Sequence, residues 1–189
     1  MSGLCGRLGA NIALDCTNPL QAGTRDRGIV LNFDDIIGRT YAADGCTLEA
    51  ITLASGAVGY YIDGQKNSIA PKSTMVARTF TNMFDHEVTM KGFDISPETK
   101  VQVNELKDSR VVVITENYYQ GSGGNAAFEV YGLTVGLVAV EIERDPNSEE
   151  TEGAFHFKFM TDTNKEPKTA NTFFDTDYAT TKAIVDALL

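Results

Sequence analysis

The strongest candidate for chemistry is the run Asp85-His86-Glu87, which places an imidazole between two carboxylates. Such groups can act in general acid–base catalysis or bind a metal ion. The run lies within Thr79–Lys91, where apolar and polar residues alternate in a pattern that predicts a β-strand. Neighbouring side chains of a strand point to opposite faces, so both carboxylates should face away from His86. We therefore expect a structural histidine at this position.

The second histidine and an acidic segment are candidates for metal binding only. His156 lies between Phe155 and Phe157, with no second histidine or cysteine nearby. Residues 141–152 hold six acids and one base, but calcium loops space their acids around an obligatory glycine, and this segment has Pro146 instead. We interpret it as a solvent-exposed acidic loop. Its acids are Glu141, Glu143, Asp145, Glu149, Glu150 and Glu152.

The cysteines and glycines also lack the spacing of a known site. Cys5, Cys16 and Cys46 form no CxxC pair, and an odd number of cysteines cannot all pair within one chain. We expect three reduced thiols in a reducing compartment, with Cys5 inert because no histidine lies in its segment. The glycine-rich runs Gly3–Gly9 and Gly121–Gly124 lack the GK[ST] ending of a phosphate-binding loop and are interpreted as flexible loops.

Two further groups of residues deserve a functional test. Glu116 or Glu129 would need a second carboxylate at a fixed distance in a cleft to form a glycosidase pair, and the sequence places none. Exposed aromatic rings typically form carbohydrate platforms, and Tyr60-Tyr61 and Tyr118-Tyr119 are candidates. Each pair should straddle two faces of a strand, which puts one ring of each pair in the core. No catalytic, cofactor-binding or metal-binding residue is predicted, and no cofactor.

The net charge of the chain argues against nucleic acid and anionic membranes as binding partners. The chain of 189 residues has 16 lysines and arginines against 26 acids, a formal net charge of 16 − 26 = −10. Such a chain is a poor candidate for wrapping DNA or binding an anionic membrane. No run of about 18 apolar residues and no apolar core of a secretory signal are present. We expect a soluble intracellular product, or one assembled inside a cell, without a membrane partner.

The elements that position these residues are mostly strands. Residues 1–28 carry scattered glycines and no lasting periodicity, which predicts an irregular N-terminal arm before a single β-rich domain at 29–189. Thr79–Lys91 is the clearest strand, and its length suggests a hairpin arm or a strand bent by a bulge. Gly132 and Gly136 indicate a bulge or kink within 128–144, and Gln65–Ser73 is predicted as a polar loop. The other predicted strands are Ile29–Phe33, Thr47–Leu53, Val58–Asp63, Arg110–Glu116 and Ala154–Met160.

Two helices complete the prediction. Ser96-Pro97-Glu98 combines a cap, a proline at the first helical position and an acid at the positive end of the helix, so a surface helix should run to about Asp108. A second helix should follow Asp175 or Thr176, either of which can cap it. No βαβ alternation is present. We predict a mainly β (α+β) fold: an antiparallel β-sandwich or barrel of seven or eight strands with a long hairpin strand, one short middle helix and a C-terminal helix.

This order of elements resembles the tail tube proteins of tailed bacteriophages and related neck or ring proteins. The features that carry the resemblance are the glycine-rich arm, the long alternating strand Thr79–Lys91, the helix Ser96–Asp108 and the acidic face after further strands. The segment Phe128–Leu189, with its YGLTVGL and FFDTDYATTKA runs, is also similar to phage structural proteins. The C-terminal helix after Thr176 is less typical of the smallest tube proteins.

The resemblance implies a non-enzymatic virion protein, assembled in the host cytoplasm. Tube subunits form rings, usually hexameric, that stack and contact other tail or neck proteins. DNA would pass through the lumen without specific binding, and net negative charge suits that conduit because it repels phosphates. A long exposed strand is an aggregation hazard unless a neighbouring subunit pairs with it. The arm 1–28 could gain order on docking.

Two alternatives remain open from the residues alone. One is a monomeric β-sandwich module that binds carbohydrate or another protein, which predicts a stable monomer with an exposed tyrosine patch. The other is a small enzyme that uses carboxylates, which predicts a cleft holding an acid of raised pKa.

Overall fold

The computed structural model describes residues 10–13, 16 and 18–189 and is mainly β, with 42% strand and 14% helix. The predicted class, with a short middle helix and a C-terminal helix, is confirmed. Eleven strands join one sheet, more than the seven or eight expected. The strands are β1 (Thr24–Asn32), β2 (Ile36–Tyr41), β3 (Leu48–Leu53), β4 (Tyr60–Asp63), β5 (Ile69–Ala77), β6 (Asn82–Gly92), β7 (Arg110–Asn117), β8 (Phe128–Tyr131), β9 (Leu137–Glu143), β10 (Phe155–Met160) and β11 (Asn171–Phe173).

The sheet follows the order β2-β3-β11-β8-β7-β9-β10-β6-β5, and β1 pairs with both β4 and β7. Pairing is antiparallel throughout except between β3 and β11, which are parallel at Leu48 and Phe173. The all-antiparallel prediction is wrong at that point. Strand β11 reaches β3 only after the chain has completed β10, and a connection of this length permits the parallel arrangement, which a short hairpin turn would not.

Strands β1 and β7 form the middle of the molecule, with apolar side chains on both faces. Val112 and Ile114 pack in one apolar cluster with Val185 of helix α2 (Tyr178–Asp186), whereas Val111 and Val113 pack in a second cluster with the phenylalanines of β10. Burial on both faces explains the unbroken β-branched run of β7. In β10 one face alone is buried, so Phe155, Phe157 and Phe159 alternate with polar residues as predicted.

The structure corrects several predicted boundaries. Strand β1 begins at Thr24, within the range predicted as arm, and β2 and β11 were not predicted. The polar loop predicted at Gln65–Ser73 is wrong, because β5 begins at Ile69 and pairs with β6 along its whole length. Its Pro71 is compatible with a strand at the edge of the sheet, where a missing N–H breaks no ladder.

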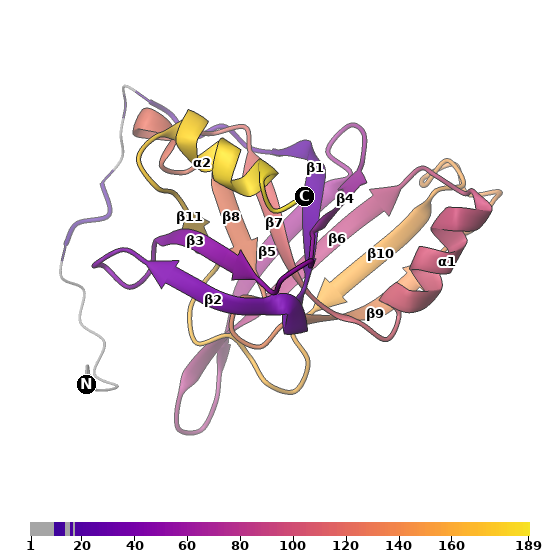
Figure 1. The fold of residues 1–189 in the computed structure, drawn as a ribbon, viewed down its shortest axis with the longest axis horizontal. Helices are drawn as coiled ribbons and strands as arrows, with labels where there is room; N and C mark the ends of the chain where they lie inside the picture. Colours follow the sequence, from indigo (N-terminus) through magenta and orange to yellow (C-terminus); the bar gives the residue numbers. More distant parts are fainter. Residues whose placement is uncertain (1–9, 14–15, 17) are drawn as a thin grey trace.

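The long strand forms the predicted hairpin, but it begins later than expected. The alternation in Thr79–Lys91 places Phe80 on the same buried face as Val88, but that expectation is wrong. Strand β6 starts at Asn82, so Phe80 lies in the turn at the hairpin tip and is 90% exposed. Figure 1 shows this hairpin projecting from the body at the lower left. The region 128–144 holds two strands, and the predicted kink is the turn between them, where Gly132 and Gly136 both have φ +76°.

Two α-helices flank the strands. Helix α1 (Pro97–Leu106) begins after the predicted cap Ser96, whose Oγ accepts a hydrogen bond from the Thr99 N–H at 3.2 Å. Helix α2 (Tyr178–Asp186) is capped by Asp177, not by Asp175 or Thr176, and Asp177 Oδ1 accepts from the Thr180 N–H at 2.8 Å. In the part of the chain that is described, no helix is long and apolar enough to cross a membrane.

Candidate functional site

The histidine between two carboxylates has the structural surroundings expected for it. His86 is buried, the Gly132 N–H donates to its Nδ1 at 3.1 Å, and its Nε2 therefore donates to the Lys168 carbonyl oxygen at 3.1 Å. Burial lowers the pKa of His86 below its usual value, against the opposing effect of the buried Glu166 carboxylate. A neutral imidazole with both nitrogens bonded to backbone is a structural link between strands.

The neighbouring carboxylates point away from the imidazole, as the alternation predicts. Asp85 Oδ1 lies 3.1 Å from Lys165 Nζ and accepts a hydrogen bond from the Thr161 hydroxyl. Glu87 Oε1 lies 3.4 Å from Lys158 Nζ on the next strand. These groups therefore tie β6 to β10 and the loop that follows it, and they form no catalytic set with His86.

Glu166 is a buried carboxylate that sequence reasoning missed. Its Oε1 accepts the backbone N–H groups of Thr134 and Val135 at 2.8 and 2.9 Å, in the turn between β8 and β9. Its own backbone forms a bridge to Phe84 of β6. No signal in the sequence marks it, since it lies in a polar loop and its partners are backbone groups distant in the chain.

The acidic segment 141–152 is solvent-exposed at all six acids, as interpreted from the sequence, although Glu141 and Glu143 belong to β9 and not to a loop. His156 Nδ1 lies 3.8 Å from Glu141 Oε1 across the strand pair. Within the described residues, no three histidine, cysteine, aspartate or glutamate side chains gather as metal ligands would. This segment therefore supplies surface charge.

The remaining candidates have structural partners. Glu116 binds the Tyr178 hydroxyl and Arg25 Nε, both at 2.7 Å, and Glu129 accepts from the Tyr131 hydroxyl at 2.5 Å.

The glycine run Gly121–Gly124 packs against the start of α2. Gly124 has φ +92°, and a Cβ there would lie 2.5 Å from Tyr178 Cβ.

The structure describes two of the three cysteines. Cys16 and Cys46 are free and exposed, whereas Cys5 and the run Gly3–Gly9 lie outside the described residues.

The tyrosine pairs differ from their prediction and lead to a groove. Tyr60 and Tyr61 of β4 are 56% and 54% exposed, so neither ring is in the core. Tyr118 is also exposed, and Tyr119 is half-buried. Strand β4 pairs only with β1 among the described residues, and Ile62 is its one residue packed against a core cluster. The prediction of one buried ring therefore fails for the pair Tyr60-Tyr61.

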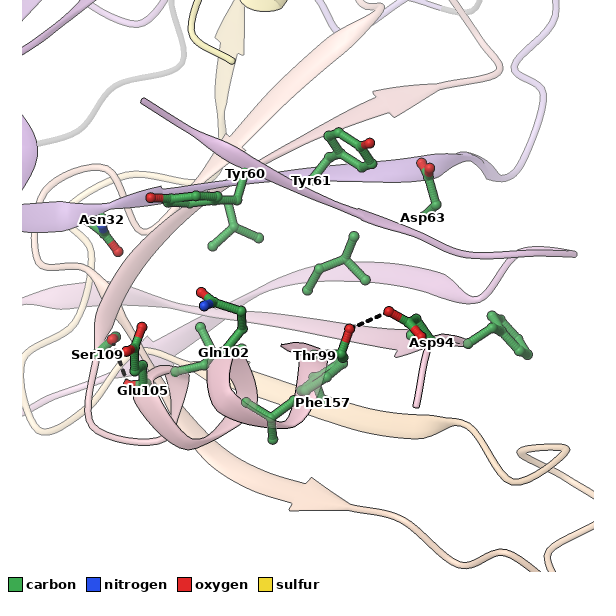
Figure 2. A pocket seen from close by; sticks show the side chains of 16 residues that line it. Asn32, Tyr60, Tyr61, Asp63, Asp94, Thr99, Gln102, Glu105, Ser109 and Phe157 are labelled. Atoms are coloured by element: carbon green, nitrogen blue, oxygen red, sulfur yellow. Dashed lines mark hydrogen bonds between the residues drawn. The ribbon is translucent and has the colours of Figure 1, made fainter. Parts of the chain in front are cut away.

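The groove lies between β4 and α1 and has a volume of about 480 Å³. Figure 2 shows Asn32, Tyr60 and Tyr61 on one side and Thr99, Gln102 and Glu105 of α1 on the other. Its walls are mixed in character. The apolar part comes from Val30, Ile62, Phe93, Val103, Leu106 and Phe157, and the carboxylates are Asp63, Asp94 and Glu105.

The charged side chains that line this groove are all carboxylates. Asp94 accepts hydrogen bonds from the Thr99 and Ser96 side chains and from the Ser96 N–H, and these bonds hold the pKa of its carboxyl below the usual value. Asp63 is paired with Arg27 Nε at 2.6 Å. Of the described residues that line the groove, none is a lysine or arginine. The arrangement suits an apolar or cationic group and disfavours an anion.

Comparisons with known proteins give no assignment. No family model matches the chain, and neither a curated protein nor a solved structure shows a significant match.

Proposed function

We propose that the chain is a non-enzymatic structural protein that assembles into rings, of the kind found in phage tail tubes and necks. The proposal is based on the two end strands of the sheet, which do not pair with each other to close it. Its path ends at β2 on one side and at β5 on the other, and each end strand exposes a large apolar side chain. Ile37 of β2 is 67% exposed and Met75 of β5 is 57% exposed.

Free strand edges favour association with another chain, because their unpaired N–H and C=O groups bond a further strand. Pairing of the β2 edge of one copy with the β5 edge of the next is a head-to-tail contact. Such contacts close into a ring when the rotation between copies allows it and otherwise form a filament. Pro71 and Lys72 discourage pairing at the start of β5, so Ser73–Ala77 is the segment expected to pair.

The acidity of the chain supports the conduit role. A ring of copies, each of net charge −10, repels phosphates, so DNA would slide through its opening without specific binding. We propose a virion location and contacts with further tail or neck proteins on this basis. The ring number, proposed as six, rests on the resemblance alone.

The test is electron microscopy and mass measurement over a concentration series, on the full chain and on edge variants. Ile37→Lys and Met75→Lys place a charge on an edge side chain that contacts solvent, so both should stay folded and lose rings. Val140→Lys is the matched control, since Val140 is 53% exposed on β9, an inner strand. A full chain that stays at 20.5 kDa at every concentration would contradict the proposal.

A monomeric binding module is the second candidate, favoured by the exposed Tyr60 and Tyr61 beside the groove. Aromatic rings with nearby amides and carboxylates are typical of sugar recognition. A glycan screen on the monomer, with Tyr60→Ala as the control, distinguishes it from the ring-forming protein.

A further inference from the structure

The tip of the β5–β6 hairpin carries an aromatic side chain that no other described residue buries. Arg78 and Thr81 close the turn with a backbone hydrogen bond of 3.2 Å, and Phe80 projects between them. Phe80 is the most exposed aromatic side chain among those described. Its burial on a partner would remove a large apolar surface from water.

The part of this hairpin nearest the tip has positive charge. Residues 69–84 contain two bases, Lys72 and Arg78, and no acid, in a chain of net charge −10. The Arg78 guanidinium donates a hydrogen bond to the Thr163 carbonyl oxygen at 2.8 Å. It forms no ion pair with a carboxylate of the described residues. The tip therefore offers an aromatic ring beside an uncompensated cation.

The groove between β4 and α1 offers the complement. It combines an apolar wall with the carboxylates Asp94 and Glu105, and no described base lines it. Val103 and Leu106 of α1 are only half-buried at its edge. An aromatic ring that entered the groove would cover them.

A single chain cannot make this contact with itself. Figure 1 shows the hairpin tip and α1 on opposite sides of the molecule. The tip of one copy can reach the groove only on another copy. The two surfaces differ, so the contact is head-to-tail and propagates from copy to copy.

We propose that the groove between β4 and α1 receives the β5–β6 hairpin tip of the next copy. Phe80 lies against the apolar wall beside Tyr60, and Arg78 faces Asp94 and Glu105. This inference rests on the proposed self-assembly and names one of its contacts.

The first experiment separates the two surfaces by mutation. Phe80→Ser removes the ring at the tip, and Gln102→Arg adds bulk and positive charge inside the groove. Each should raise the concentration for half-maximal assembly at least about tenfold, without a change in Tm. The matched controls are Val140→Ser and, on α1 outside the groove, Asn104→Arg, and both should assemble like the parent chain.

Mixing the two variants gives the sharper result. The Phe80→Ser chain keeps its groove and the Gln102→Arg chain keeps its tip, so at a concentration where neither variant assembles alone an equimolar mixture should form a 1:1 dimer through this contact. A dimer limited to twice 20.5 kDa supports the proposal. Variants that assemble like the parent overturn the hairpin contact and leave the ring proposal standing.

A peptide keeps the test independent of assembly. A peptide of residues 72–84 should shift the amide NMR signals of α1 and β4 in the full chain, and the same peptide with Phe80→Ser should not. If the full chain is monomeric, the ring proposal fails, and peptide binding alone decides the contact. Absence of binding at millimolar peptide overturns it.

Discussion

The two helices of this protein have similar lengths and both begin at a well-formed cap, yet they relate to the core in opposite ways. Helix α2 buries Thr181 and Val185, and Leu188 just beyond it is also buried. Helix α1 has no buried residue. In Figure 1, α2 lies over β8 and β11, whereas α1 stands at the side of the molecule beside β10.

The difference comes from tertiary contacts and not from helix propensity. The Tyr178 ring at the start of α2 stacks on Phe128 with centroids 5.8 Å apart, and its hydroxyl donates to Glu116. Helix α1 makes only partial contact through Val103 and Leu106. Helix α2 packs closely on the strands and covers the core, whereas the partial contacts of α1 leave a groove that another molecule can enter.

The largest expected effect comes from equal truncations in the two helices. Val185→Ala should lower the free energy of unfolding by about 2 kcal/mol, because it opens a cavity in the cluster beneath α2. Val103→Ala should lower it by less than about 1 kcal/mol, because that side chain is half-exposed. Urea unfolding of both variants measures the difference. Equal losses would contradict the contrast between the helices.

A smaller effect is expected from the polar end of α2. Tyr178→Phe keeps the stacked ring and removes the hydroxyl that donates to Glu116 at 2.7 Å. Loss of this hydrogen bond should cost about 1 kcal/mol of unfolding free energy, since Glu116 keeps its ion pair with Arg25. Thermal unfolding of the variant beside Tyr118→Phe, a tyrosine without that bond, provides the measurement. Identical Tm values would show that the hydroxyl adds nothing.

The cap of α1 should matter locally and little globally. Ser96→Ala removes the acceptor for the Thr99 N–H, so α1 should fray and its amides at 98–106 should exchange faster with solvent. Global Tm should change by less than about 1 °C, because α1 buries no residue. Hydrogen exchange with mass detection tests both parts. A large loss of Tm would mean that α1 supports the core.

The smallest effect is a pH dependence that should again separate the helices. Hydrogen bonds from the Thr180 backbone and side chain lower the pKa of Asp177 at the α2 cap, and those from Thr99 and Ser96 lower the pKa of Asp94 before α1. A carboxyl with a lowered folded-state pKa stabilises the fold above its usual value of 3.8 and loses that contribution as pH falls.

Asp177→Asn keeps a capping acceptor that does not titrate, so its Tm should fall less steeply than that of the parent below about pH 4. Asp94→Asn should leave the pH dependence of Tm nearly unchanged and alter only the exchange of α1 amides. Thermal unfolding between about pH 5 and pH 2 distinguishes the two. Parallel curves for Asp177→Asn and the parent would exclude the cap as a source of acid sensitivity.

Local signals predicted the helices and the strands with a buried face. Ser96-Pro97 marks the start of α1 because a cap depends on neighbouring backbone, and β10 shows its alternating phenylalanines because one face meets the core. Strand β5 was not predicted, because an edge strand with Pro71 and several exposed residues lacks the alternation of buried apolar and exposed polar residues. The hairpin was predicted, but the exposure of Phe80 was not, because it depends on the turn closing between Arg78 and Thr81.

The groove could not be predicted from the sequence for a different reason. Tyr60 and Gln102 are far apart in the chain, and only the pairing of β4 with β1 and the stand-off position of α1 bring them to one place. The burial of Glu166 has the same origin, since its partners are backbone N–H groups of a distant turn. Side-chain patterns carry no information on such backbone partners.

Strand β1 has a mechanical consequence. It is hydrogen-bonded along one edge to β4 and along the other to β7, and it is the first strand after the residues that precede Thr24. A tension applied through those residues is directed along β1 and loads both ladders in shear, so many bonds must break together. Strand β2, which among the described residues bonds only to β3, would instead peel away bond by bond. Pulled from its N-terminal side, the molecule should therefore behave as a stiff anchor.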